Sequence, residues 1–172
     1  MTIPAPDVAP TLQQLAFGDL SHELQQTRRI LERLPDDRLD FRPHAKSWTL
    51  GEIATHVASL PMWGTAILTG EVYDLATGGP RRAALPDRAA VLAEFESHVA
   101  AMGAALEATD DAKLMATWQL RRGDHVIMAM PRAAALRAMV ISHLIHHRGQ
   151  LSVYLRLTDT PVPGLYGPSA DD

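Results

Sequence analysis

The sequence predicts an all-α protein, a four-helix bundle with a small irregular or hairpin insertion between its third and fourth helices. Two observations predict this class. Apolar residues recur at helical spacing in four long segments, and one short stretch between the last two segments changes to an extended pattern. The length of 172 residues is that of one domain. We therefore expect residues 1–10 to form a flexible arm, because they are rich in proline, and residues 11–172 to form a single bundle domain.

The four helices are separated by proline, by glycine or by polar connectors. They are expected over residues 11–34, 49–69, 87–108 and 131–157. Residues 71–86 contain Gly-Gly-Pro and few apolar side chains, which is typical of a long loop. Residues 112–130 contain two short extended runs around Arg122-Gly-Asp124, which indicates a hairpin. Short connections elsewhere favour antiparallel packing of neighbouring helices.

The start of the second helix has the strongest local signal. Thr49-Leu-Gly-Glu52 has the form of a capping box, in which each of the two side chains accepts a hydrogen bond from the other residue's backbone. Trp48 precedes this cap and is placed to form a hydrophobic staple with Ile53. The capping position explains Glu52 better than metal ligation does. Pro61 lies inside the helix and should bend it, because proline removes a backbone donor and crowds the preceding turn.

Composition excludes several function classes. The chain has 16 Lys and Arg against 20 Asp and Glu, a net charge of −4, so it lacks the surplus of cations that nucleic-acid binding requires. No long apolar run or signal-peptide pattern is present, so we expect a cytoplasmic protein without a membrane role. The absence of cysteine excludes disulfides, thiolate metal sites and a cysteine nucleophile. What remains conspicuous is the presence of eight histidines.

Three of these histidines share a direction. His143 and His147 project one turn apart from the inner stripe of the fourth helix, which is how a helix presents two imidazoles to one metal ion. His56 lies on the inner stripe of the second helix. The alternative is that all three are separate core histidines, each bonded to backbone or water. We expect a shared metal site, because the second and fourth helices can be neighbours in a bundle.

The other five histidines are weaker candidates. His146 should lie on the flank of the pair, and His98 lies at the edge of the apolar stripe of the third helix. We expect the remaining three to be exposed to solvent. His22 lies on a polar helix face, His44 in a connector and His125 in the hairpin.

Possible supporting residues surround the three histidines. Gln150 could orient a ligand or a water, or only satisfy a loop backbone. Trp63 and Tyr154 could line a pocket, although aromatic residues on a bundle stripe are usually core. Arg148 points away from His147, which favours a role facing solvent or binding the C-terminal tail.

The fourth helix is also apolar on the side opposite its histidines. This outer face comprises Ala138, Ile141 and Ile145. An apolar face has to be covered, either by the insertion at residues 112–130 or by a second subunit.

Three segments resemble the DinB family, also described as DinB/YfiT-like metalloenzymes. They are Arg42-Pro-His-Ala-Lys-Ser-Trp-Thr-Leu-Gly-Glu-Ile-Ala-Thr-His56, His143-Leu-Ile-His-His147-Arg-Gly-Gln-Leu, and the tail from Val162 to Asp172. The resemblance implies an up-down-down-up four-helix bundle, often a homodimer, with one divalent metal held by three histidines. Carried over to this chain, those ligands are His56, His143 and His147. Some relatives are thiol-dependent transferases or isomerases that use bacillithiol, mycothiol or glutathione, and others were named for induction by DNA damage.

Three neutral imidazoles would leave a divalent ion its full charge and an open position, as in catalytic sites. Such an ion can lower the pKa of bound water to about 7 or bind a substrate thiolate. Since the chain has no cysteine, any thiol must be a small-molecule cosubstrate. We therefore expect a thiol-dependent S-transferase or a hydrolase that acts on a small molecule with Zn or Ni. The alternative is a non-catalytic metal- or ligand-binding protein of the stress response.

Overall fold

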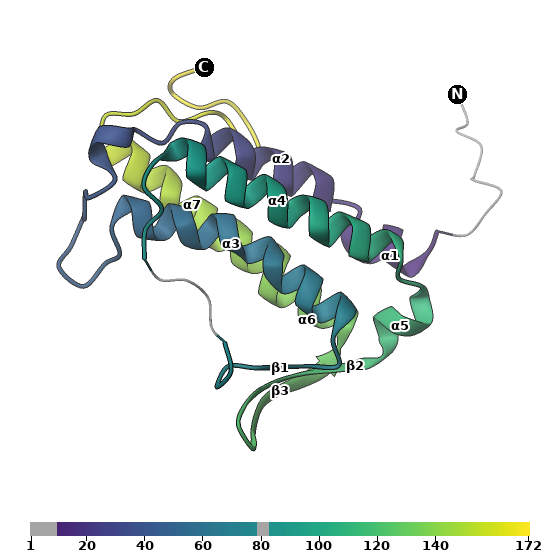
Figure 1. Ribbon diagram of the computed structural model, residues 1–172. Coiled ribbons are helices and arrows are strands. Elements are labelled where there is room, and N and C mark those ends of the chain that lie inside the picture. Colours follow the sequence, from purple (N-terminus) through teal and green to yellow (C-terminus); the bar gives the residue numbers. More distant parts are fainter. Residues whose placement is uncertain (1–9, 79–82) are drawn as a thin grey trace, which may run out of the picture.

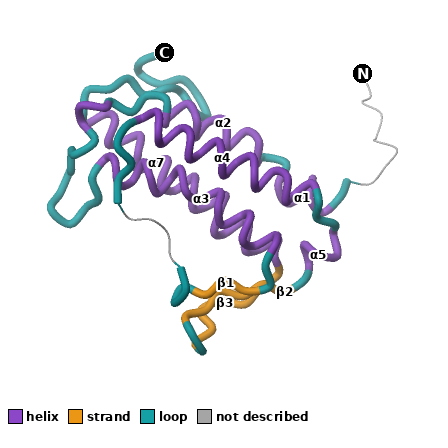
Figure 2. Tube along the Cα trace, in the orientation of Figure 1, coloured by secondary structure: helices purple, strands orange, loops and turns teal. Residues whose placement is uncertain are grey.

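The computed structural model describes residues 10–78 and 83–172, and almost all of the predicted arm at residues 1–10 lies outside them. The described chain is mostly helical and carries one three-stranded sheet at one end of the helices (Figures 1 and 2). The predicted all-α class is therefore correct for the body of the fold. The insertion is more regular than expected, because its hairpin gains a third strand.

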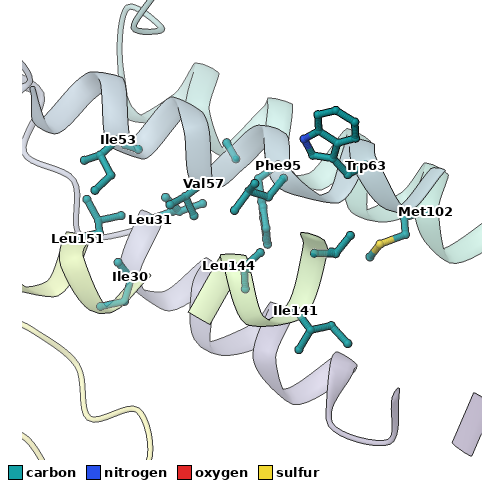
Figure 3. Close-up of a cluster of buried hydrophobic side chains, with 14 of the residues drawn as sticks. Ile30, Leu31, Ile53, Val57, Trp63, Phe95, Met102, Ile141, Leu144 and Leu151 are labelled. Atoms are coloured by element: carbon teal, nitrogen blue, oxygen red, sulfur yellow. The ribbon is translucent and has the colours of Figure 1, made fainter. Parts of the chain in front are cut away.

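Four long helices enclose the core. They are α2 (Leu20–Leu31), α3 (Leu50–Thr69), α4 (Arg88–Glu107) and α7 (His143–Leu157). Contacts run from α2 to α4, from α4 to α3, from α3 to α7 and from α7 back to α2, which closes a ring. In Figure 1, α2 and α7 run toward the end with the C-terminal tail, whereas α3 and α4 run toward the sheet. Figure 3 shows the side chains that fill the ring, among them Ile30, Val57, Phe95 and Leu151.

The helix expected over residues 11–34 is interrupted, so that part of the prediction is wrong. Its first turns form α1 (Leu12–Phe17), and α2 begins after Gly18 and Asp19. A Cβ atom at Gly18 would lie 2.8 Å from the Gln14 carbonyl oxygen, a contact that only glycine avoids. The break lets α1 meet α5 (Asp111–Met115), where the Leu12 amide donates to the Asp111 carboxylate at 3.2 Å. A short 3-10 helix, Asp36–Arg38, follows α2.

Helix α3 begins where the capping box predicted. The Thr49 amide donates to Glu52 Oε2 at 2.7 Å, and the Glu52 amide donates to Thr49 Oγ1 at 3.1 Å. Assignment of Glu52 to the cap is thereby confirmed. The helix continues through Pro61 to Thr69, and the bend expected at the proline stays a prediction.

The sheet consists of β1 (Val72–Asp74), β2 (Thr117–Arg122) and β3 (His125–Pro131), in that order. Strands β2 and β3 form the predicted antiparallel hairpin, and Gly123 takes a positive φ of 58° at its turn. Strand β1 pairs parallel with β2, although residues 71–86 were expected to be loop only. Three residues are too few to show a period-2 pattern, and their pairing partner is distant in the sequence.

The buried Arg132 joins the sheet to the helices. It begins α6 (Arg132–Leu136), and its guanidinium donates to the carbonyl oxygens of Ile67 and Gly70, each at 3.0 Å. It also donates to the Glu71 carboxylate at 2.9 Å. Orphan carbonyls at the end of α3 are thus satisfied by a cation, which the helix dipole favours there.

The last helical segment is continuous but not uniform. Between α6 and α7 lies a π-helical stretch, Arg137–Ser142. A π-helix has more residues per turn, so it rotates the residues on either side relative to an ideal α-helix. Val140 and Ile141 are therefore both buried, and the predicted outer-face position of Ile141 is wrong. Of the other two residues assigned to that face, Ala138 is exposed and Ile145 packs partly against the core.

Among the described residues, one helix is long and apolar enough to cross a membrane. It is α4, which has a window of 18 residues that meets this criterion by length and composition. The core helix of a protein without a membrane passes the same criterion, and α4 packs along both α3 and α2. Residues 10–78 and 83–172 therefore contain no clear membrane span.

Candidate metal centre

Helices α3 and α7 bring three histidines together. His143 Nε2 lies 3.4 Å from His56 Nε2 and 2.9 Å from His147 Nε2. One ring nitrogen of each residue lies within 4.8 Å of the other two. A tetrahedral zinc ion bound through nitrogen at about 2.0–2.1 Å separates its ligand atoms by roughly 3.3 Å. The three side chains predicted from the sequence are therefore close enough to hold one metal ion.

The helices explain why these nitrogens converge. His143 and His147 are one turn apart at the start of α7, so both rings leave the same face. Helix α3 packs against that face and supplies His56. The π-helical stretch ends at Ser142, directly before His143, and thereby sets the rotation of α7 with respect to α3.

The imidazoles are half-buried and favour their neutral form. Burial, followed by the charges that His147 and His143 carry when protonated, lowers the pKa of His56 from 6.5 to about 4. Burial also lowers the pKa of His143 and of His147. A neutral imidazole is the form that binds a metal, so the site does not need to lose protons near pH 7.

Gln150 orients one of the three rings. Its Oε1 lies 2.7 Å from His147 Nδ1, so Nδ1 carries the proton and donates it to Gln150. The remaining nitrogen, Nε2, is then free to face the other histidines. A hydrogen bond of this kind is the usual way in which a metal-binding histidine is held in its correct tautomer. Gln150 therefore bonds the ring of His147, and its role in orienting a metal ligand stays a prediction.

Trp48 covers the cluster on one side. Its ring lies parallel to that of His147, with centroids 5.7 Å apart, and edge-on to that of His56 at 4.9 Å. The sequence pattern assigned Trp48 only to the hydrophobic staple. The local pattern does not show that Trp48, which precedes the cap of α3, also contacts His56, two turns inside that helix. This contact forms where α7 packs beside α3.

A pocket of about 430 Å³ opens beside His147 and Gln150. Its remaining lining residues come from the connector before α3, from α3 itself and from α7, namely Lys46, Ser47, Trp48, Ile53, Val153 and Tyr154. Small-molecule sites have volumes of this order and combine an apolar wall with a few polar groups. Sequence reasoning missed Lys46, Ser47 and Val153, because nothing in their local pattern distinguishes them from ordinary surface residues.

The two aromatic candidates have different positions. Tyr154 lines the pocket, and its hydroxyl donates to the Trp48 carbonyl oxygen at 3.1 Å, which fixes the connector to α7. Trp63 is buried and packs against Tyr73, with ring centroids 4.7 Å apart. It is not among the residues that line this pocket, so the core interpretation holds for Trp63.

Most remaining histidines lie outside the cluster, as expected. His146 flanks it, with its ring centroid 4.8 Å from that of His147. His22 and His98 bond residues one turn away on their own helices, namely Gln26 and Glu94. His44 accepts from the Lys46 amide, and His125 begins β3.

Arg148, the residue after His147, belongs to a separate cluster, in which Arg148 and Glu23 are buried and Tyr166 is exposed. Its guanidinium donates to Glu23 Oε2 and to the Tyr166 hydroxyl, each at 2.5 Å, and to the Glu23 carbonyl oxygen at 2.9 Å. Tyr166 in turn donates to Glu23 Oε2 at 2.8 Å, and burial together with this bond raises its pKa. Since Arg148 is buried, the solvent-facing interpretation is wrong and the tail-binding one is correct.

Comparison with known proteins agrees with this fold. The model of the DinB family matches residues 13–172. The uncharacterized protein YrdA of Bacillus subtilis (strain 168) is 30% identical over 151 residues, which are 87% of this chain and 85% of that protein. The crystal structure of a DinB-like protein from Bacillus cereus ATCC 10987 superimposes with a TM-score of 0.70 at 22% identity and covers 91% of this chain and 98% of its own.

A second solved structure, the DinB-like protein YjoA from Bacillus subtilis, has a TM-score of 0.66 at 19% identity. The match covers 88% of this chain and 97% of that one. At these identities the two structures show that the fold is shared. The family match over nearly the whole described chain and the similarity to YrdA establish that this chain belongs to the DinB family.

Proposed function

We propose that this protein is a metal-dependent enzyme that binds one divalent ion through His56, His143 and His147. The observation that supports it is the convergence of three neutral imidazole nitrogens next to an open pocket. An all-histidine set with no carboxylate or thiolate leaves the charge of the ion undiminished, which is the ligand pattern of catalytic sites. Imidazole suits both Zn and Ni, our two candidate metals.

A divalent ion held by these histidines would supply Lewis-acid chemistry, which favours deprotonation of a water or a thiol. Residues of the chain would orient the metal ligands, shield the site and position the substrate. Gln150 holds His147 in the tautomer that leaves Nε2 free, and Trp48 shields one side of the cluster from solvent. The pocket then positions a small-molecule substrate beside His147.

The reaction class that we propose is S-transfer from a low-molecular-weight thiol, or hydrolysis. The chain contains no cysteine, so its own side chains cannot provide a sulfur nucleophile. A thiol cosubstrate would therefore share the pocket with the electrophile. The pocket volume of about 430 Å³ is within the range of small-molecule sites.

Metal analysis tests the first step. The purified protein, reconstituted with zinc or nickel and desalted, should retain about one ion per chain, and the variants His56→Ala, His143→Ala and His147→Ala should lose it. His22→Ala is a matched control, because His22 bonds Gln26 outside the cluster. Failure of the parent protein to retain metal would overturn the proposal.

An activity screen tests the second step. Electrophiles and ester or amide substrates are supplied with and without bacillithiol, mycothiol or glutathione, using the metal-loaded protein and its His143→Ala variant. Turnover that needs both the thiol and His143 supports S-transfer, and turnover without thiol supports hydrolysis. Stoichiometric metal without any turnover would favour the alternative, a non-catalytic metal- or ligand-binding protein.

The proposal includes an up-down-down-up four-helix bundle that forms a homodimer. The opposed helix directions in Figure 1 and the closed ring of contacts support the bundle. An exposed, largely apolar groove between α2 and α4, lined among others by Leu24, Phe95 and Val99, supports a covering second copy. Sedimentation analysis should give a dimer for the parent protein and a monomer for Val99→Glu, and a monomeric parent would refute the homodimer.

A further inference from the structure

The pocket beside the histidines has an uneven distribution of charge. Trp48, Ile53, Val153 and Tyr154 form an apolar and aromatic wall, whereas Lys46 is its one charged lining residue besides the titratable His147 among those that the structure describes. No carboxylate within the described ranges forms an ion pair with Lys46. Lys46 is an exposed lining residue, and within the described ranges its ammonium group has no carboxylate partner.

The connector that carries Lys46 is held in place. Arg42 donates to the Ser47 carbonyl oxygen at 2.6 Å and pairs with Glu52 of the capping box. Tyr154 donates to the Trp48 carbonyl oxygen at 3.1 Å, which ties the connector to α7. These bonds hold the carbonyl groups of Ser47 and Trp48, so they fix the backbone directly after Lys46 relative to α7.

From this arrangement we infer that the pocket binds a small carboxylate with an apolar or aromatic body. The body packs against Trp48 and its neighbours, the carboxylate pairs with Lys46, and the opposite end of the molecule is directed toward His147. This inference rests on the proposed function only in that His147, one of the three proposed metal ligands, lines the pocket. It names the substrate class, and it assigns Lys46 as a residue that determines specificity.

A pair of isosteric probes tests the inference. Binding of 2-naphthoate and of its neutral analogue 2-naphthamide is measured by calorimetry at pH 7.5, with the metal-free and the zinc-loaded protein. The parent should prefer the carboxylate. Lys46→Gln should weaken naphthoate binding about five-fold, the size expected of one partly exposed ion pair, and leave naphthamide binding unchanged.

The chain provides a matched control in Lys113, its other lysine, which is exposed on α5. Lys113→Gln changes the net charge by the same amount, so it separates a general electrostatic effect from a local one. Lys113→Gln should bind both probes as the parent does.

Side-chain NMR signals locate the probe. Of the three tryptophans, Trp48 is 42% exposed, whereas Trp63 and Trp118 are 6% and 0% exposed. Naphthoate should shift only the indole N–H signal that Trp48→Phe removes.

Equal affinity of the parent for the two probes, an unchanged naphthoate affinity in Lys46→Gln, or no binding at millimolar concentration would overturn the inference. These results differ from failure of the proposed function. A protein that retains no zinc but prefers naphthoate through Lys46 refutes only the metal enzyme. A protein that retains zinc without this preference refutes only the carboxylate pocket.

Discussion

Helix α7 presents two adjacent residues, His147 and Arg148, to two polar clusters that differ in how completely they are satisfied. Arg148 meets Glu23 and Tyr166, and the cation, the carboxylate and the hydroxyl each have partners within the cluster. His147 lies close to His56 and His143. In their neutral form these three imidazoles can each accept a hydrogen bond or bind a metal, but none of the three is a cation or an acid. The two clusters share a helix and are built from consecutive residues.

The difference separates a structural cluster from a functional one. A buried ion pair is stable only with full compensation by hydrogen bonds, and the Arg148 cluster provides it while anchoring α7 to α2 and to the C-terminal tail. The histidine cluster is half-buried, keeps its imidazoles neutral and opens on a pocket. Substitutions in the first cluster should therefore change folding stability, and those in the second should change ligand binding.

The largest effect is expected at Glu23. Glu23→Ala leaves Arg148 buried without its counterion and should lower the free energy of unfolding by about 3–5 kcal/mol, measured by urea denaturation of the metal-free protein. Glu32→Ala, at the C-cap directly after α2, removes an exposed pair with Arg28 and should cost at most about 1 kcal/mol. Should Glu23→Ala not fold, Glu23→Gln keeps a hydrogen-bond acceptor and gives the same ranking. Equal losses for Glu23 and Glu32 would contradict the comparison.

Next is Gln150, on the histidine side. Gln150→Ala removes the bond to His147 Nδ1 and should weaken zinc affinity about 10–100-fold, measured by competition with a chelator. Its unfolding free energy without metal should stay within about 0.5 kcal/mol of the parent, because Gln150 is exposed. Gln25→Ala, an exposed glutamine on α2, serves as the control. Zinc affinity unaffected by Gln150→Ala would show that this bond does not prepare the site.

The pH dependence of the metal-free protein should also distinguish the clusters. The pKa of His56 is lowered from 6.5 to about 4, so the unfolded chain takes up a proton at higher pH than the folded protein does. The stability that depends on this histidine is complete above pH 6.5 and is lost as pH falls toward 4. Urea midpoints across this window should fall less steeply for His56→Gln than for the parent. Parallel curves would refute the lowered pKa.

The smallest effect is expected at Tyr166. Tyr166→Phe removes the hydroxyl that bonds Glu23 and Arg148, whereas the ion pair between those two residues remains. The unfolding free energy should fall by about 1 kcal/mol, with zinc affinity unchanged. Thermal unfolding and the same chelator competition measure both. A loss as large as that of Glu23→Ala would mean that the tail, and not the ion pair, closes this cluster.

The three histidines could be predicted from the sequence, whereas most of the residues around them could not. His143 and His147 are four residues apart on one helix, so local geometry alone puts their rings on one face, and His56 followed from the apolar stripe of its own helix. Arg148 shows the limit of the same reasoning. A helical wheel predicts correctly that the Arg148 side chain points away from His147, but it does not predict the partners of Arg148. Only tertiary packing brings Glu23 and Tyr166 to this side chain.

Errors in the predicted fold arose where a distant contact overrides the local pattern. Strand β1 exists because β2 pairs with it, α1 separates from α2 at Gly18 and docks on α5, and the π-helical stretch buries Ile141. None of these contacts leaves a periodic signal within its own segment.

By itself, the sequence determined the helical class, the capped start of α3, the hairpin and the three histidines, because each depends on neighbours within a few turns. Only the tertiary structure decided what surrounds those histidines. The pocket with Lys46 and Trp48, the orienting bond from Gln150 to His147, and the burial of Arg148 depend on how α3, α7, α2 and the tail pack. Packing and the π-helical stretch before His143 set the rotation of α7 about its axis. This rotation decides which of the adjacent residues His147 and Arg148 faces the other two histidines.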